Sequence, residues 1–146
     1  MASSIKTQII AKLIAICQPL IAQEVVRKVV RKHALFLTES VTPALHIVVG
    51  DEKVLYQDER GYNMQFPVAF QIIFAQNRDP ESAGDAFEAF LQTNIEADEQ
   101  LAGLASKITY NGAAPFIREE LNPVALTVAM YLVEYRRYKA QPNVGY

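Results

Sequence analysis

The sequence predicts an α+β protein with a mixed, mostly antiparallel sheet of four to five strands and two main helices packed on one face. Two segments repeat apolar residues at helical spacing, whereas others alternate apolar residues as strands do. Along the chain the order is helix, a segment with two interpretations, two or three strands, helix and two strands. The chain has 146 residues and no spacer, so we expect one domain over 1–146 with flexible ends at 1–4 and 139–146.

The first helix begins after Ser4, whose side chain suits an N-cap. It ends near Pro19, which cannot continue an α-helix. No apolar run in the chain approaches the roughly 18 residues that are needed to cross a bilayer, so we expect no membrane span. Lys12 lies within this apolar stretch and no small-residue cleavage pattern follows, so we expect no signal peptide. The apolar residues at helical spacing are Ile5, Ile9, Leu13, Ile16 and Leu20.

The chain contains one cysteine, Cys17, which lies on the apolar stripe of the first helix. A lone cysteine excludes an internal disulfide framework, and this fits a protein made in the cytoplasm, where thiols stay reduced. We interpret Cys17 as a buried, inert thiol rather than a nucleophile.

The segment 24–32 has two interpretations. Its sequence, EVVRKVVRK, repeats about every four residues, which on a helix would place four valines on one side and four basic residues on the other. The β-branched valines favour a strand instead. Both conformations therefore remain open for this segment.

The basic residues of this segment form a dense positive cluster, although the net charge of the chain is -2. One interpretation is a solvated face or a subunit contact to the acidic residues between 79 and 99. The other is contact with a nucleic-acid phosphate backbone. We favour the first, because dedicated nucleic-acid binders are usually basic overall. The cluster consists of Arg27, Lys28, Arg31 and Lys32.

Strands are expected in the middle of the chain. The apolar run ALHIVV at 44–49 lies between Pro43 and Gly50, and EKVLYQ can form a short strand before the turn DERGYN at 58–63. Residues 64–75 then alternate large apolar side chains with smaller or polar ones. Their apolar face must lie against helices, because burying each large apolar side chain is worth roughly 1.5–3 kcal/mol.

A second amphipathic helix is expected from Asp79 to about Ile95. Asp79 suits the N-cap, and Pro80 suits the first helical position, where its missing N–H costs nothing. Apolar residues then recur three and four apart. A short helical turn follows and is capped near Gly103.

A strand is expected over 106–110, followed by a turn at Asn111 and Gly112. The segment 112–122 then crosses to the last strand.

The last strand, 122–138, has apolar residues at alternate positions on both faces. At about 3.3 Å per residue it would reach roughly 45 Å, whereas strands of roughly five or six residues are commonest. Helices that carry Leu13, Phe87 and Phe90 can cover one face, and no remaining segment is apolar enough to cover all of the other. We therefore interpret its outer end, 134–138, as part of a subunit contact.

Motifs for catalysis or cofactor binding are missing from the sequence, which carries no GxGxxG, GxxxxGK[ST], GxSxG or HExxH. His33 and His46 lack a second histidine or cysteine at ligand spacing, so we interpret both as packed or hydrogen-bonded side chains. The adjacent carboxylates at 98–99 and 119–120 point apart on a helix or strand, and we expect them to be solvated. We predict no enzyme activity, catalytic residue, metal site or cofactor.

Several pieces of the chain carry a resemblance to a known family. They include the N-terminal helix SIKTQIIAKLIAIC, the strand and turn TPALHIVVGDE, and the helix DPESAGDAFEAFLQTNIEADEQLAGLA. In this order they resemble the tail terminator, or minor tail, proteins of long-tailed bacteriophages and prophages, over about 5–138. The most characteristic residues are those of D-x-x-L-x-G-L and of the Tyr-Arg end of the last strand, here Asp98, Leu101, Gly103, Leu104, Tyr135 and Arg136.

The resemblance implies a structural protein of the virion tail, synthesised in the cytoplasm of the host bacterium and without a membrane contact. It implies a ring, expected to be hexameric, that caps the tail tube, ends tube polymerisation and offers the surface for head joining. The implied partners are other copies of the chain, the tail-tube protein, the head-completion or neck protein, and passing DNA as a non-specific contact.

Two other classes of function remain open, namely a neck or head-completion protein of the same virions and a nucleic-acid-binding α+β module. The interface or DNA-lumen candidates lie in the basic segment, in the loop before the last strand and at the end of that strand. They are Arg27, Lys28, Arg31, Lys32, Arg118, Glu134, Arg136 and Arg137.

Overall fold

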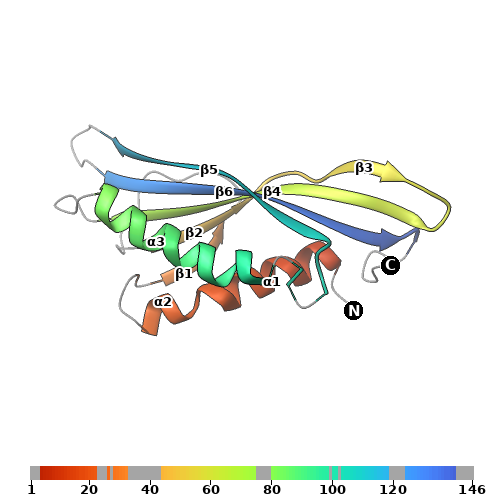
Figure 1. The fold of residues 1–146 in the computed structure, drawn as a ribbon, viewed down its shortest axis with the longest axis horizontal. Coiled ribbons are helices and arrows are strands. Elements are labelled where there is room, and N and C mark those ends of the chain that lie inside the picture. Colours follow the sequence, from red (N-terminus) through yellow and green to blue (C-terminus); the bar gives the residue numbers. More distant parts are fainter. Residues whose placement is uncertain are drawn as a thin grey trace.

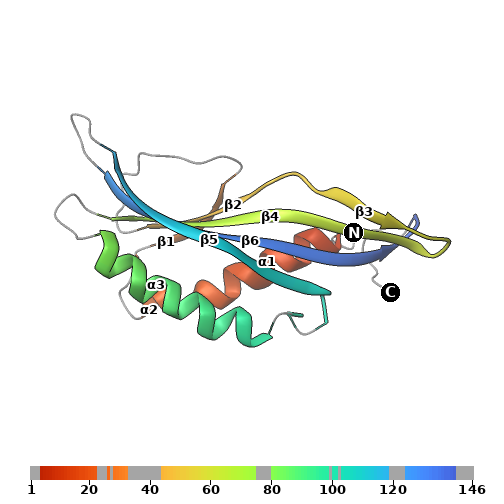
Figure 2. The ribbon, with the colours of Figure 1, turned by 45° about the horizontal axis from the view of Figure 1, so that its top comes forward.

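A long sheet carries the helices on one of its faces in the computed structural model (Figures 1 and 2). The structure describes residues 4–22, 26, 28–32, 44–74, 80–98, 100–101, 103–118 and 124–140. The strands are β1 (Lys28–Lys32), β2 (Ala44–Val49), β3 (Lys53–Gln57), β4 (Gly61–Phe74), β5 (Lys107–Arg118) and β6 (Val124–Tyr138). The helices are α1 (Ile5–Cys17), α2 (Pro19–Ala22) and α3 (Pro80–Asn94), with a 3-10 turn η1 (Glu96–Asp98).

The sheet has the order β1-β2-β4-β6-β5, and β3 also pairs with β4. The β1–β2 pair is parallel and the other described pairs are antiparallel. Because β6 pairs with β4 from Gly61 to Phe74, both β2 and β3 must lie on the other side of β4, where they form one interrupted strand. The predicted α+β fold, with a mostly antiparallel five-strand sheet and two main helices, is confirmed.

The interruption between β2 and β3 begins at Gly50, where the chain runs close to β4. The N–H of Gly50 donates to the carbonyl oxygen of Pro67 at 2.9 Å, and Lys6 Nζ donates to the carbonyl oxygen of Gly50 at 3.2 Å. A Cβ at this position would lie 2.5 Å from Cγ of Pro67. Glycine therefore allows the two chain segments to approach at this point.

Helix α1 begins as the sequence predicts, because Ser4 Oγ accepts a hydrogen bond from the N–H of Thr7 at 3.2 Å. The helix ends at Cys17, and Pro19 then opens the short helix α2, a position where proline is well tolerated. Ile9 and Leu13 of α1 are almost fully buried in the core.

The stretch Ile5–Ala22 is long and apolar enough, by length and composition alone, to cross a membrane. The expectation that no segment meets this criterion was therefore wrong. In the structure one side of the stretch belongs to the hydrophobic core that it shares with the sheet, as in a core helix. The buried residues on that side are Ile5, Ile9, Ile10, Leu13, Cys17 and Leu20.

The structure decides between the two interpretations of the basic segment in favour of a strand. Val29 pairs with Leu45 and Arg31 with Ile47, so that β1 lies parallel to β2. The ladder satisfies the backbone groups of a segment rich in β-branched residues, which outweighs the near-helical repeat of its charges. Arg27 lies outside the described residues.

One face of β4 forms the centre of the core, as predicted from its alternation. The core side chains of β4 that face the helices are at most 4% exposed. Helix α3, which begins at Pro80 as expected, contributes Phe87 and Leu91 to the same cluster. Asp79, the expected N-cap, lies outside the described residues. The β4 residues in the core are Met64, Phe66, Val68, Phe70 and Ile72.

The prediction of a turn at Asn111 and Gly112 was wrong, because β5 continues through both residues. The register shifts between Tyr110, which pairs with Tyr131, and Ala113, which pairs with Ala129. This shift adds one residue to β5, so the two residues form a bulge, and Gly112 has the positive φ of 102° that such a site favours. The bulge lets β5 follow β6 over most of its length.

The two faces of β6 differ in burial. Ala129, Tyr131, Val133 and Tyr135 are at most 2% exposed on the helix side, whereas Met130 on the other face is 41% exposed. The part of β6 with described side chains is therefore covered on one face only, as we expected from the sequence. We call the uncovered side the open face of the sheet.

The predicted flexible ends lie mostly outside the described residues, which exclude 1–3 and 141–146. Ser4 caps α1, and the N–H of Lys139 donates to the carbonyl oxygen of Arg60 at 3.1 Å, so both residues are held in place.

Replacing Gly61 by alanine should lower the free energy of unfolding by about 1–3 kcal/mol, because the new Cβ would overlap the carbonyl oxygen of Arg137 on β6. Urea denaturation followed by circular dichroism measures the change. The exposed turn variant Glu59→Ala is the control and should stay within about 0.5 kcal/mol of the parent. Equal stability of the two variants would contradict the close approach of β4 and β6.

Candidate functional site

The sheet extends past the helices as an arm of three strands (Figures 1 and 2). The arm consists of β3, residues 61–65 of β4 and residues 134–138 of β6, which pair side by side. β4 lies in the middle, with β3 on one side and β6 on the other. The arm therefore presents two different long sides.

The β3 side of the arm is an exposed apolar edge. All five residues of β3 are exposed. The solvent-exposed fractions of Val54, Leu55 and Tyr56 are 52%, 43% and 58%. A bulge between Val54 and Tyr56 interrupts the pairing with β4. No strand pairs with the outer side of β3 within the described part of the chain. Edges of this kind are sites at which another chain can associate.

The base of the arm is fixed by a hydrogen bond from the hydroxyl of Tyr135 on β6 to the carboxylate of Glu52, just before β3. The ring of Tyr135 also meets Phe66 edge to face, with 5.9 Å between centroids. Burial first, and then the Glu52 carboxylate, raise the pKa of Tyr135. The phenol is therefore neutral at ordinary pH and acts as the donor in this contact.

The tip of the arm is held by a turn and by a cation that stacks on an aromatic ring. Asp58 Oδ1 accepts from the N–H groups of Arg60 and Gly61 at 2.8 Å and 3.0 Å, which closes the turn between β3 and β4. The guanidinium of Arg137 lies 4.6 Å from the ring centroid of Tyr62. Arg137 therefore belongs to the helix-side face of the arm, where it packs on an aromatic ring.

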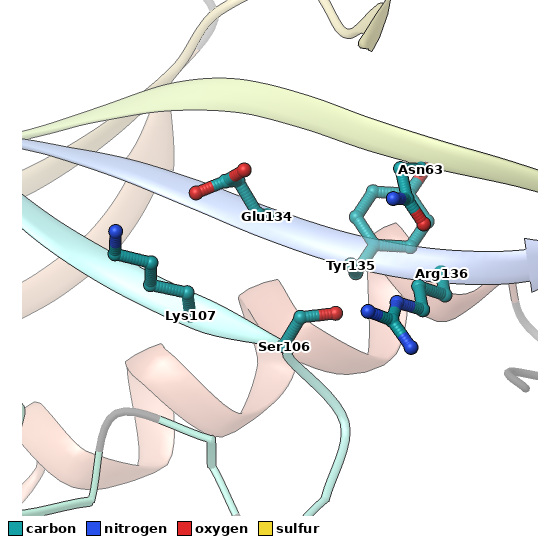
Figure 3. A pocket seen from close by; sticks show the side chains of 6 residues that line it. All are labelled: Asn63, Ser106, Lys107, Glu134, Tyr135 and Arg136. Carbon is teal, nitrogen blue, oxygen red and sulfur yellow. The ribbon is translucent and has the colours of Figure 1, made fainter. Parts of the chain in front are cut away.

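A hollow of about 250 Å³ lies on the β6 side of the arm, where β5 begins (Figure 3). Lys107 and Glu134 are directly opposite each other on β5 and β6, and Asn63 faces Arg136 across β4 and β6. Asn63 Oδ1 is buried and has no hydrogen-bond donor among the described residues. The lining residues are Asn63, Ser106, Lys107, Glu134, Tyr135 and Arg136.

The hollow is polar and small compared with sites that take metabolites, which enclose roughly 300–1,000 Å³. Within the described residues, no group of three or more His, Cys, Asp or Glu side chains could hold a metal ion. The arrangement of one acidic, two basic and several hydrogen-bonding groups suits a polar contact with another macromolecule rather than a chemical step.

The structure separates the interface candidates named from the sequence into distant groups. Glu134 and Arg136 line the hollow, whereas Arg137 lies on the opposite face of the arm. Arg118 pairs with Val124 at the far end of β5 and β6, and only its backbone is described. Of the cluster Arg27, Lys28, Arg31 and Lys32, the side chain of Arg31 is described and is exposed on the edge strand β1.

The other residues considered as sites are buried or lie outside the described part. Cys17 is fully buried, and burial raises the pKa of its thiol to about 12, so the nucleophilic thiolate does not form near neutral pH. His46 is fully buried on β2 opposite Gln71. His33 lies outside the described residues, and Asp98 is exposed.

Two parts of the candidate site were not identified from the sequence, namely the exposed β3 edge and the hollow. The available signal for the edge was the run of Val54, Leu55 and Tyr56 between charged turns, which is unusual for a solvent-facing strand. The hollow had no sequence signal, because its residues come from three strands that are distant in the chain.

Comparison with known proteins adds no relative, because no protein-family model matches the chain and no curated protein matches it. The resemblance to tail terminator proteins therefore rests on the sequence pieces quoted above and stays a prediction.

Replacing Tyr135 by phenylalanine should lower the free energy of unfolding by about 1–2 kcal/mol, because the hydrogen bond to Glu52 is lost while the ring contact is kept. Denaturation in urea at pH 7 measures this loss. The matched variant Tyr56→Phe changes an exposed ring and should stay within about 0.5 kcal/mol of the parent.

The difference between the parent and Tyr135→Phe should also depend on pH. Because the pKa of Tyr135 is raised above its ordinary value of 10.0, the stabilisation is complete below about pH 10 and decreases as the pH rises further. A loss at pH 7 equal to that of Tyr56→Phe would contradict the proposed anchoring of the arm.

Proposed function

We propose that this protein is a structural, non-enzymatic component of a bacteriophage or prophage tail that associates with copies of itself into a ring. The ring caps the tail tube at its full length, ends tube polymerisation and offers the surface to which the head joins. Its partners are other copies of the chain, the tail-tube protein and the head-completion or neck protein. The proposal combines the sequence resemblance with the shape of the sheet.

The observation that carries the proposal is a sheet covered by helices on one face that extends into an arm with an exposed apolar edge. Such an edge, with Leu55 at 43% exposure, invites uncontrolled pairing when it is left without a neighbour. In a closed ring every copy gives this edge a neighbour, and closure limits assembly to a fixed number of copies.

The binding energy of such a ring comes from many weak contacts repeated around its circumference. The open face adds apolar surface at Met130, which is 41% exposed, and at the half-buried Val128 and Leu132. Exposed basic residues such as Arg31 give non-specific attraction to the phosphate groups of DNA that passes through the ring. None of these roles requires a reacting group.

Purified protein should elute from size-exclusion chromatography with a mass that is a fixed multiple of the monomer, or should assemble when tail tubes are added. Light scattering measures the mass, and electron microscopy should show a ring at one end of each tube. A monomer at every concentration, both with and without tail tubes, would contradict the proposal.

Deletion of the gene from its phage should give overlong tail tubes, because nothing then ends polymerisation. Electron microscopy of the particles measures the tail length, and complementation with the intact gene is the control. Tails of normal length without heads would instead assign the protein to the neck.

A further inference from the structure

We propose that neighbouring copies contact each other arm against arm, with the β3 edge of one copy seated on the hollow beside β6 of the next. The inference rests on the proposed ring and names the two surfaces that build it. The β3 edge here means residues 51–60, and the β6 side means the hollow.

The two sides of the arm are different surfaces, so a contact between them is of the head-to-tail kind. Register places β3 and β6 on opposite sides of β4, with Tyr56, Asn63 and Arg136 forming one row across the open face. A head-to-tail contact leaves one unused surface of each kind after every addition. In a ring, the two surfaces that are left over at the ends of the row of copies contact each other.

The charges of the two surfaces are opposite in sign. The β3 edge carries four acidic and two basic residues, a net charge of -2, and the β6 side carries two basic residues and one acidic residue, a net charge of +1. Opposite potentials favour this pairing over contact between two equal sides. The residues counted are Asp51, Glu52, Lys53, Asp58, Glu59 and Arg60 on the edge, and Lys107, Glu134 and Arg136 on the β6 side.

The size of the hollow suits a single inserted side chain. Its volume of about 250 Å³ is below that of ordinary ligand pockets, which begin at roughly 300 Å³. Tyr56, at 58% exposure, is the most exposed large apolar residue of the described part and lies in the middle of the β3 edge. Its hydroxyl supplies a donor of the kind that the buried Asn63 Oδ1 lacks among the described residues.

The bulge in β3 determines the form of the contact. It breaks the regular row of backbone groups between Val54 and Tyr56, so another strand cannot continue the ladder in register along this edge. Contact through side chains remains possible. Two β3 edges brought together would also oppose net charges of -2, which disfavours a symmetric dimer through this edge.

Two variants test the inference. An edge variant carries Tyr56→Ala and Glu59→Ala, and a hollow variant carries Lys107→Glu and Arg136→Glu. Each alone should fail to form rings and should raise the concentration needed for assembly by at least about tenfold, as measured by light scattering. An equal mixture should form a dimer containing one copy of each, because the edge variant keeps its hollow and the hollow variant keeps its edge.

Controls show whether a variant has misfolded. They also show whether the proposed function fails or only the proposed contact. The variant Gln92→Ala changes an exposed residue on α3, outside the arm and the open face, and should form rings as the parent does. Both test variants should keep the parent's circular dichroism spectrum and melting temperature. A variant that exchanges the charges within one chain, Glu59→Lys with Lys107→Glu, should assemble at a lower concentration than either single variant, because the two surfaces are again opposite in charge.

Rings formed by both test variants, or dimers of the hollow variant with itself, would overturn the contact while leaving the ring proposal intact. If the parent protein itself never assembles, the proposed function fails instead.

Discussion

The pairing of β4 with β6 over fourteen residue pairs is the constraint on which the rest of the molecule depends. Both strands place large apolar side chains on the same face, and this face must be covered because each such side chain is worth roughly 1.5–3 kcal/mol when buried. Helices α1 and α3 cover it, with Leu13 and Phe87 among the contacts in the shared core. The two strands are longer than the helices that cover them, and the excess length is the arm (Figure 1).

Elements with one clear period could be predicted from the sequence, and elements with two competing periods could not. The apolar repeats of α1 and α3 and the alternation of β4 and β6 each fit one conformation, and the structure has them there. The segment that contains β1 fits a helix and a strand equally well, and its conformation depends on pairing with β2. Asn111 and Gly112 have the composition of a turn, but the ladder to β6 continues on both sides of them and leaves a bulge instead.

The candidate site was predictable only where its residues follow one another in the chain. Glu134 and Arg136 were identified because charge replaces apolar residues at the end of β6. Their neighbours in the hollow, Asn63 and Lys107, come from β4 and β5 and meet them only through strand register. The importance of β3 was also hidden, because a five-residue strand with Val54 and Leu55 looks like core until its partners are known.

The interruption between β2 and β3 has a mechanical consequence. A pull along the arm cannot be passed from β3 to β2 through a continuous ladder, because the chain leaves β4 after Gly50 and pairs with it again at Lys53. The load instead runs along β4 and β6, whose hydrogen bonds lie across the direction of the pull. Bonds loaded in shear must yield together rather than one after another, so the arm resists extension along its length.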